Sequence, residues 1–337
     1  MSAIRPLAFT ILAAALAVGS SAAPPEGKGG GGGGKGGKDD AADFQPEILY
    51  QYNGRKSQDV RLTDIDASSF VTVHAAEPAQ LDGFAASDEE HAMIAYAEAG
   101  DIYLTNWTAS PVEIGGKALI SARDDRAPGS GRVHWMDFSP DGTRLVFTES
   151  SAEPNNLGSD AERRLWVYEI GSETLSLVLW NFSILDVAWS PVKDEDDVVY
   201  FTGGAVGLNY PEHLFRFDMA TGDLDPVLTY GIDYTSRYFD ITGKHAAGPP
   251  KIAMAFKEAD GRDYIRIYDL AGNRLYSDWM SRGDILNFDC TGTRLIGKDE
   301  GSTGANLTIT QVGGTATGFV SGRGYHSVSD WMPRNPC

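Results

Sequence analysis

Apolar and polar residues alternate over short stretches along most of this chain, which is the pattern of β-strands with one buried face. Leu165–Ile170, Leu214–Asp218 and Tyr264–Tyr268 alternate in this way, and a glycine-containing turn and another apolar stretch follow each of them. After the first 22 residues, no segment has the 3.6-residue period that is typical of an amphipathic helix. The pattern predicts an all-β chain of antiparallel strands.

One unit recurs along the sequence: a short apolar strand, a turn and a second strand. It is clearest where the strand that ends at Phe138 runs through the turn Ser139–Gly142 into Leu145–Phe147. Proline fixes φ and glycine accepts positive φ, so this turn has a physical basis. The aromatic residues that anchor the first strands are spaced by 54, 51, 50, 49 and 43 residues, at Phe84, Phe138, Trp189, Phe239, Phe288 and Trp331.

A period near fifty residues with four strands in each unit is typical of the blades of a β-propeller. The six anchors therefore predict a six-bladed β-propeller of four-stranded antiparallel blades over residues 44–337. Trp331 begins a strand that has no room for a blade before Cys337, whereas Ile48–Tyr52 has no inner strand in front of it. We therefore expect the C-terminal inner strand to pair with the N-terminal strands and to close the ring.

The turn Phe138–Gly142, together with Leu145–Phe147, resembles the WD40-like repeat of TolB-type propellers. The resemblance covers roughly residues 44–337, and it implies a six-bladed propeller in the periplasm or outside the cell. The motif shapes a turn, so no functional residue transfers with it. The amino-terminal domain that accompanies the propeller in TolB has no counterpart in this sequence.

The first 22 residues have the layout of a signal peptide, with Arg5, the apolar run Leu7–Val18 and small residues up to Ala22. The run is shorter than the roughly 20 apolar residues that span a bilayer, so we expect cleavage after Ala22 and export. Residues 23–43 are mostly glycine, lysine, proline and aspartate, and they predict a flexible linker. No other segment is apolar enough to be transmembrane.

The charge balance narrows the range of partners. The chain has 28 lysines and arginines against 47 aspartates and glutamates, a net charge of −19 at pH 7. A nucleic-acid partner would need a basic footprint, so this balance argues against one. It favours a monomer that is soluble outside the cell, or a basic or metal-bearing partner.

The sequence contains none of the common catalytic motifs that we sought: a G-x-S-x-G elbow, an H-E-x-x-H zinc pair or a P-loop. Its six histidines are not spaced as a local metal pair, and His134, Asp284 and His326 meet only if the repeats align as expected. We therefore expect no metal and no cofactor.

The acidic run Asp194–Asp197 indicates a solvated turn, and Arg123–Arg126 stays open between a solvated loop and a ligand contact.

The longest connections all fall on one rim of the expected propeller, at Gly115–Arg132, Ser150–Arg163 and Gly203–Glu212. Long loops on a rigid scaffold are where binding usually takes place. Residues just before each inner strand would surround the channel mouth on that rim; they include Arg132, His134, Tyr234, Arg237, Arg282, Asp284, Tyr325 and His326. The alternative is that these groups satisfy one another around a water-filled channel.

Cys290 lies in the turn of the last full unit, and Cys337 lies six residues beyond the final anchor. In an oxidising compartment the pair could form a disulfide that fastens the chain end to the ring. The alternative is two free thiols.

These observations predict an exported binding or scaffold protein for a protein or peptide partner, possibly a polysaccharide. Two alternatives stay open: a carbohydrate-active hydrolase or lyase with its site in the central channel, and a polysaccharide-binding lectin. Propellers carry all three functions, so the fold does not decide between them.

Overall fold

The computed structural model describes residues 48–331 with internal gaps, and its contacts divide the chain into the units Met1–Lys38 and Asp39–Cys337. The gaps are 54–56, 64–69, 78–80, 88–90, 110–111, 127–129, 152–162, 206–212, 231–237, 244–245, 247, 258–262, 281–285, 290, 302–303, 313–315 and 319–324. The expected signal peptide (1–22), the linker (23–43) and both cysteines lie outside the described residues, so they remain predictions. Within the described part of the chain, no helix has the length and apolar character that crossing a membrane requires.

The two ends of the described chain share one four-stranded sheet, in the order β24-β1-β2-β3. Its strands are β1 (Ile48–Asn53), β2 (Gln58–Thr63), β3 (Phe70–Ala76) and β24 (Tyr325–Trp331). β24 runs antiparallel to β1, with Ile48 opposite Trp331. The pairing between the C-terminal strand and the first strand is the one that the sequence predicts.

The second sheet has five strands rather than the expected four. They are β4 (Leu81–Ala86), β5 (Met93–Glu98), β6 (Asp101–Ala109), β7 (Val112–Ile114) and β8 (Ala118–Ser121). β6 is nine residues long, so one part of it pairs with β7 and another with β8. The expected open connection Gly115–Arg132 therefore contains β8, the one-turn helix α1 (Arg123–Arg126) and the start of β9.

A seven-stranded sheet contains what the sequence predicts as two separate blades, in the order β15-β14-β13-β12-β11-β10-β9. It consists of β9 (Ser130–Phe138), β10 (Arg144–Ser151), β11 (Arg163–Glu169), β12 (Thr174–Trp189), β13 (Val198–Ala205), β14 (His213–Asp218) and β15 (Leu224–Thr229). The 16 residues of β12 contain no glycine or proline that would interrupt a strand. Its first part pairs with β11 and its second part with β13, so the two expected blades are joined.

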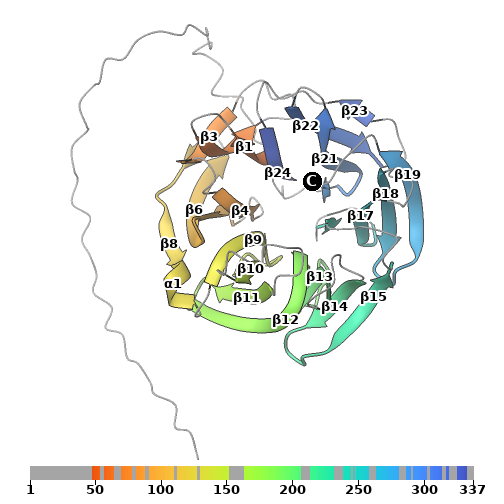
Figure 1. Ribbon diagram of the computed structural model, residues 1–337, viewed down its shortest axis with the longest axis horizontal. Coiled ribbons are helices and arrows are strands. Elements are labelled where there is room, and N and C mark those ends of the chain that lie inside the picture. Colours follow the sequence, from red (N-terminus) through yellow and green to blue (C-terminus); the bar gives the residue numbers. More distant parts are fainter. Residues whose placement is uncertain are drawn as a thin grey trace, which may run out of the picture. The chain divides into compact units, whose positions relative to one another are not determined.

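The last two sheets have four strands each, as expected. One contains β16 (Phe239–Ile241), β17 (Lys251–Lys257), β18 (Asp263–Asp269) and β19 (Arg274–Met280). The other contains β20 (Leu286–Phe288), β21 (Arg294–Gly301), β22 (Gly304–Gln311) and β23 (Ala316–Gly318). Figure 1 shows the sheets following one another in chain order, with β4, β9 and β24 on the inner side and β8, β12 and β19 on the outer side.

The turns after the inner strands show which positions are equivalent between units. In five units, the residue after the inner strand donates its N–H to the carbonyl of the first residue of the next strand: Ser87 to Met93, Ser139 to Arg144, Ser190 to Val198, Thr242 to Lys251 and Asp289 to Arg294, at 2.9–3.0 Å. The equivalent anchors are therefore Ala86, Phe138, Trp189, Ile241 and Phe288. The sequence-based choice of Phe84 and Phe239 was wrong by two residues, a shift that keeps a residue on the same face of its strand.

The hydrophobic core lies between the faces of neighbouring sheets. One buried cluster joins Ala95 and Ile102 of the second sheet to Met136 and Phe147 of the third. Inner strands also contact one another: β4 contacts β9 and β24, β12 contacts β9 and β16, and β20 contacts β16 and β24. The sheets are thus packed side by side through large apolar side chains.

Candidate functional site

The starts of β4, β9 and β11 lie at one end of the sheets, together with the β5–β6 turn and α1. The strands alternate in direction, so these points fall on the same edge. A direct contact supports this placement, because Arg126 on α1 donates from Nη2 to the carbonyl of Gly100 in the β5–β6 turn at 2.6 Å. We refer to this edge as the α1 rim.

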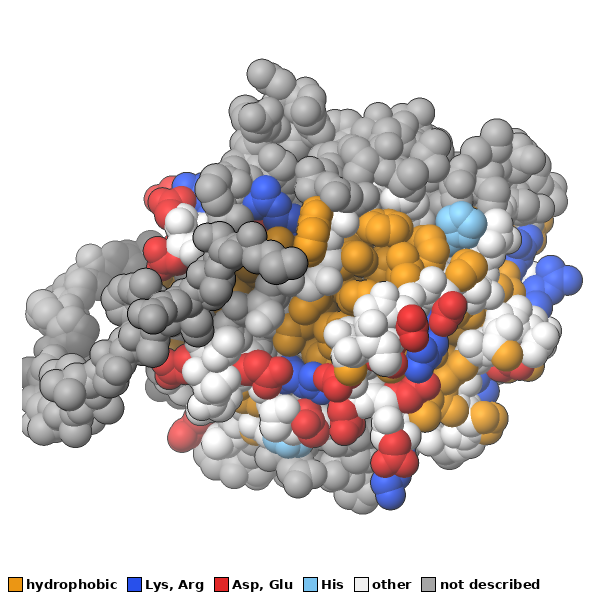
Figure 2. Space-filling model, turned by 90° about the horizontal axis from the view of Figure 1, so that it is seen from below, with side chains coloured by type: hydrophobic (Ala, Val, Ile, Leu, Met, Phe, Trp, Pro, Cys, Tyr) orange, Lys and Arg blue, Asp and Glu red, His pale blue; other side chains and the backbone are white. Residues whose placement is uncertain are grey.

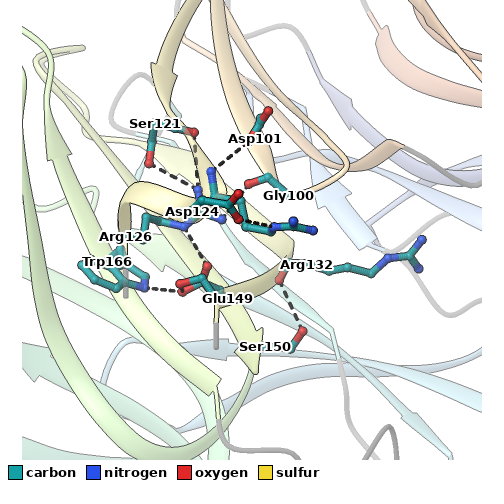
Figure 3. A network of polar contacts seen from close by, with 11 residues as sticks. Gly100, Asp101, Ser121, Asp124, Arg126, Arg132, Glu149, Ser150 and Trp166 are labelled. Atoms are coloured by element: carbon teal, nitrogen blue, oxygen red, sulfur yellow. Dashed lines mark hydrogen bonds and ion pairs between the residues drawn. The ribbon is translucent and has the colours of Figure 1, made fainter. Parts of the chain in front are cut away.

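A fully buried ion pair fixes α1 to the body of the protein (Figure 3). Arg126 Nε donates to Glu149 Oε1 at 2.7 Å, and both side chains are 0% exposed. The other carboxylate oxygen, Oε2, accepts from Trp166 Nε1 at 2.9 Å and from Ser130 Oγ at 3.1 Å. Charge and hydrogen bonds are therefore matched, as burial of an ion pair requires.

This network decides the role that the sequence left open for Arg123–Arg126. Arg123 donates its backbone N–H to Asp101 at 2.8 Å, and its side chain contacts the exposed Asp124 at 3.1 Å. Arg126 points inward to Glu149, away from solvent. The segment is a structural anchor that holds the connection between two sheets in place.

Beside this anchor, Arg132 on β9 forms an ion pair with Asp82 on β4, with 3.2 Å between Nε and Oδ1. The Asp82 side chain is only 3% exposed, whereas that of Arg132 is 57% exposed. Burial raises the pKa of Asp82 to about 6, although Arg132 and the Gly100 N–H act to lower it. Arg132 is thus held at its Nε atom by a buried carboxylate, while much of its side chain is exposed to solvent.

His134 lies two residues further along β9. Burial, together with the nearby positive charges of Arg163 and Arg132, lowers its pKa to about 3. The ring is therefore neutral at pH 7, and its buried Nε2 atom has no hydrogen-bond partner among the described residues. The backbones are close here, because a Cβ on Gly83 of β4 would lie 2.6 Å from the His134 carbonyl oxygen.

Two buried carboxylates continue from the rim into the inner strands. Asp137 Oδ2 accepts from the Trp189 N–H at 2.8 Å, and Asp186 Oδ2 accepts from the Phe239 N–H at 3.0 Å. Burial raises the pKa of Asp137 to about 7, although the N–H groups of Trp189 and Phe138 act to lower it. The pKa of Asp186 is raised by burial and by the charge of Asp137.

Sequence reasoning missed Asp137 and Asp186. The available signal was a carboxylate within or beside an otherwise apolar inner strand, a pattern that Asp240 repeats. Asp240 Oδ2 accepts from the Phe288 N–H at 2.5 Å. The edge of an inner strand has N–H groups without ladder partners, and these side chains supply acceptors for them.

The structure places the predicted rim residues unevenly. Arg132 and His134 lie two residues apart on β9, within the strand rather than before it as expected. Tyr325 and His326 belong to β24 and pair with Asn53 and Tyr52 of β1, but their side chains are not described. Tyr234, Arg237, Arg282 and Asp284 lie outside the described residues, as do Cys290 and Cys337. No group of three potential metal ligands occurs among the residues that the structure describes.

No protein-family model and no curated protein matches this chain. Solved structures do match it. TolB from Acinetobacter baumannii superimposes with a TM-score of 0.65 at 16% identity, covering 86% of this chain and 67% of TolB. A chain of the Nidogen/Laminin complex gives 0.56 at 11% identity, covering 85% and 98%. An oligogalacturonate lyase in complex with manganese gives 0.53 at 12% identity, covering 80% and 77%.

At these identities, the likeness is one of fold. The matched structures, the antiparallel sheets and the inter-sheet core agree with one another. The chain therefore has an all-β, propeller-like fold similar to that of TolB.

Proposed function

We propose that this chain is an exported β-propeller of six blades, closed through β24 and β1, that binds a protein or peptide partner at the α1 rim. Closure is supported by the contacts of the inner strands, because β4, β9, β12, β16, β20 and β24 each contact the next and β24 also contacts β4. The pairing of β24 with β1 supports it as well. Export is supported by the sequence of the first 22 residues.

The observation that carries the binding proposal is the arrangement of Arg132, Asp82 and His134. The Arg132 side chain is 57% exposed at the rim of an acidic protein, and the side chain of its partner Asp82 is 3% exposed. Arginine is a common anchor in protein interfaces, because the planar donors of its guanidinium orient a carboxylate or carbonyl of the partner. The ion pair with Asp82 holds the Arg132 side chain in place for such a contact. One structural neighbour, the Nidogen/Laminin complex, is itself an assembly of two proteins.

The experiment is a comparison of two charge reversals in the chain that follows the expected cleavage site, residues 23–337. Arg132→Glu changes the α1 rim. Arg274→Glu is the matched control, since Arg274 is an exposed arginine at the start of β19. The turn between β18 and β19 lies at the edge of the sheets opposite the α1 rim. Each protein is immobilised and exposed to an envelope fraction, and the retained proteins are identified by mass spectrometry.

We expect the unmodified chain and Arg274→Glu to retain the same protein, and Arg132→Glu to retain at least tenfold less of it. Equal retention by all three would overturn the rim as the binding surface.

The second candidate is an enzyme, because an oligogalacturonate lyase and a periplasmic gluconolactonase are among the structural neighbours. Turnover of an oligogalacturonide or a sugar lactone that His134→Gln abolishes would replace the binding proposal by that one.

A further inference from the structure

The first part of β12, Thr174–Trp180, has one edge without a strand partner among the described residues. On one side it pairs with β11, from Glu169 opposite Thr174 to Leu165 opposite Leu179. β13 pairs with β12 only from Phe182 onward. The other edge of Thr174–Trp180 therefore presents backbone N–H and C=O groups that are free to pair with another strand.

The side chains of this segment, which we name the β12 edge, contain no charge and no proline: Thr-Leu-Ser-Leu-Val-Leu-Trp. Leu177 is 37% exposed and Trp180 is 53% exposed. Figure 2 looks onto the side of the molecule where β12 lies, and it shows apolar side chains gathered across that side. Charged residues and prolines are the usual means by which an edge strand avoids pairing, and the β12 edge lacks both.

Other outer strands of the described chain differ in this respect. β15 contains Asp225 and Pro226, β19 begins with Arg274, β3 contains His74 in a hydrogen bond with Glu98, β8 has only four residues and follows Lys117, and β23 has only three residues. A register shift beside the outer strand occurs in β3, β8, β15 and β19 as well as in β12, so it does not distinguish them. The β12 edge is distinguished by combining a length of seven residues with the absence of any titratable side chain or proline.

The charges around the β12 edge indicate the chemistry of its partner. The exposed Glu173 lies in the turn directly before Thr174, whereas Glu169 on β11 lies across β12 from the unpaired edge, with its Oε1 4.0 Å from Arg144 Nε. The whole chain carries a charge of −19. A second copy would bring the same negative charge, which opposes self-association, whereas a basic strand would be attracted.

We propose that the β12 edge binds an extended strand of a partner protein by strand addition, and that this strand is apolar in its centre and has lysine or arginine at the end beside Glu173. Backbone hydrogen bonds to the free edge supply affinity, and side-chain contacts with Leu177 and Trp180 supply selectivity. This surface is separate from the α1 rim, so it stands or falls independently of the proposed function.

Three fluorescent peptides of nine residues test the proposal with the chain of residues 23–337. The first is Val-Thr-Val-Thr-Val-Thr-Val-Lys-Lys, whose lysines lie beside Glu173 when it pairs antiparallel to β12; the second has two glutamates in place of the lysines, and the third has proline at its centre. Fluorescence anisotropy should show saturable binding of the first peptide. We expect at least tenfold weaker binding of the other two, because one loses the charge match and the other cannot complete the backbone pairing.

Two variants locate the binding surface. Leu177→Lys places a charge on the β12 edge and should weaken binding of the basic peptide at least tenfold. Leu275→Lys is the matched control, because Leu275 is 55% exposed on the outer strand β19, and it should leave binding unchanged. Glu173→Lys tests the charge match separately, since it should shift the preference from the basic to the acidic peptide.

Each remaining outcome counts against the proposal. Equal binding by Leu177→Lys and Leu275→Lys would place the peptide elsewhere, and no binding of the basic peptide would reject the stated chemistry. Sedimentation velocity covers the last case: a dimer of the unmodified chain that Leu177→Lys dissociates would identify a second copy as the occupant. Circular dichroism of every variant separates these results from unfolding.

Discussion

The carboxylate of Asp137 on β9 accepts a hydrogen bond from the backbone N–H of Trp189 on β12, 52 residues further along the chain, at 2.8 Å. The Trp189 indole Nε1 donates in return to the Asp137 carbonyl at 3.0 Å. Asp240 on β16 makes the corresponding carboxylate contact with the N–H of Phe288 on β20, the next inner strand. These contacts join inner strands through side chains, at an edge where no ladder of backbone bonds exists.

Removal of the Asp137 carboxylate should therefore destabilise the protein. Asp137→Ala leaves the Trp189 N–H without its acceptor, and an unsatisfied buried donor costs about 1–3 kcal/mol. Asp137→Asn keeps an acceptor oxygen and should lose less. Urea unfolding at pH 7, followed by tryptophan fluorescence, measures both. Equal losses for the two variants would show that the hydrogen bond is not the stabilising element.

The raised pKa of Asp137 also predicts how stability depends on pH. The group titrates near 3.9 in an unfolded chain and at about 7 in the folded protein, so the folded state binds the proton more tightly. Its contribution to stability is complete below pH 4 and is lost as the pH rises to 7. Asp137→Asn should flatten the profile of unfolding free energy between pH 4 and 7, by up to about 1.4 kcal/mol per pH unit.

Asp141 provides a control of opposite sign for that profile. Burial acts to raise its pKa, but hydrogen bonds from Ser139 and Thr143 outweigh burial and lower it. Its contribution to stability is present above the unfolded pKa and is lost as the pH falls through the folded value. Asp141→Asn should therefore reduce stability at neutral pH without flattening the slope between pH 4 and 7. Identical profiles for the two variants would contradict the assignment.

His134 and Asp137 should have opposite effects on how the free energy of unfolding changes as the pH falls. Its folded pKa of about 3 lies below the unfolded value near 6.5, so the folded state holds the neutral ring. That stabilisation is present above pH 6.5 and is lost as the pH falls toward 3. His134→Gln should lose less stability than the unmodified chain between pH 6.5 and 4, as measured by unfolding in urea. A steeper loss in the variant would reject a buried neutral histidine.

The buried pair Arg126 and Glu149 should be far more sensitive than a surface pair. Arg126→Met leaves Glu149 as an uncompensated buried charge, which costs about 3–5 kcal/mol. Arg123→Met is the matched control on the same helix, where an exposed pair contributes about 0–1 kcal/mol. Adding Glu149→Gln to Arg126→Met should restore part of the loss, because the charge is removed while an acceptor remains for Trp166. Thermal unfolding of the four proteins gives the comparison.

Gly83 should tolerate no side chain. A Cβ there would lie 2.6 Å from the backbone oxygen of His134, and backbone cannot move aside as a flexible side chain can. Gly83→Ala should cost about 1–3 kcal/mol through overpacking between β4 and β9. Gly116→Ala has nothing within 4 Å and should change stability by less than about 0.5 kcal/mol. Equal stabilities in denaturant would contradict the close approach of the two strands.

Much of the fold was predictable because strands and turns leave patterns in short stretches of sequence. Turn residues such as those at Ser139–Gly142 require particular backbone angles, and the alternation in Leu165–Ile170 requires one buried face. Both therefore mark strands wherever they occur. The phase of the repeat was harder to predict, because Phe84 and Phe239 are buried aromatics two residues from the true anchors, on the same face of their strands.

The candidate site was only partly predictable. Arg132 and His134 were found because the repeat places the start of β9 at a rim. The buried partner of Arg132 is Asp82, 50 residues away on another strand, and no spacing in the sequence predicts that contact. The role of Arg126 was equally hidden, since a charged residue in a loop is usually solvated.

The sequence by itself determined the all-β class and the antiparallel strands, because propensity, alternation and turn chemistry act over a few residues. It also indicated the pairing of the last strand with the first, because the repeat leaves an incomplete unit at each end of the chain. Only the tertiary structure decided that β12 runs on through two expected blades, that Glu149 is neutralised by Arg126, and that Asp137 and Asp186 cap neighbouring strands. These features depend on burial and on distances between residues far apart in the chain. Such distances are set when the sheets pack face to face.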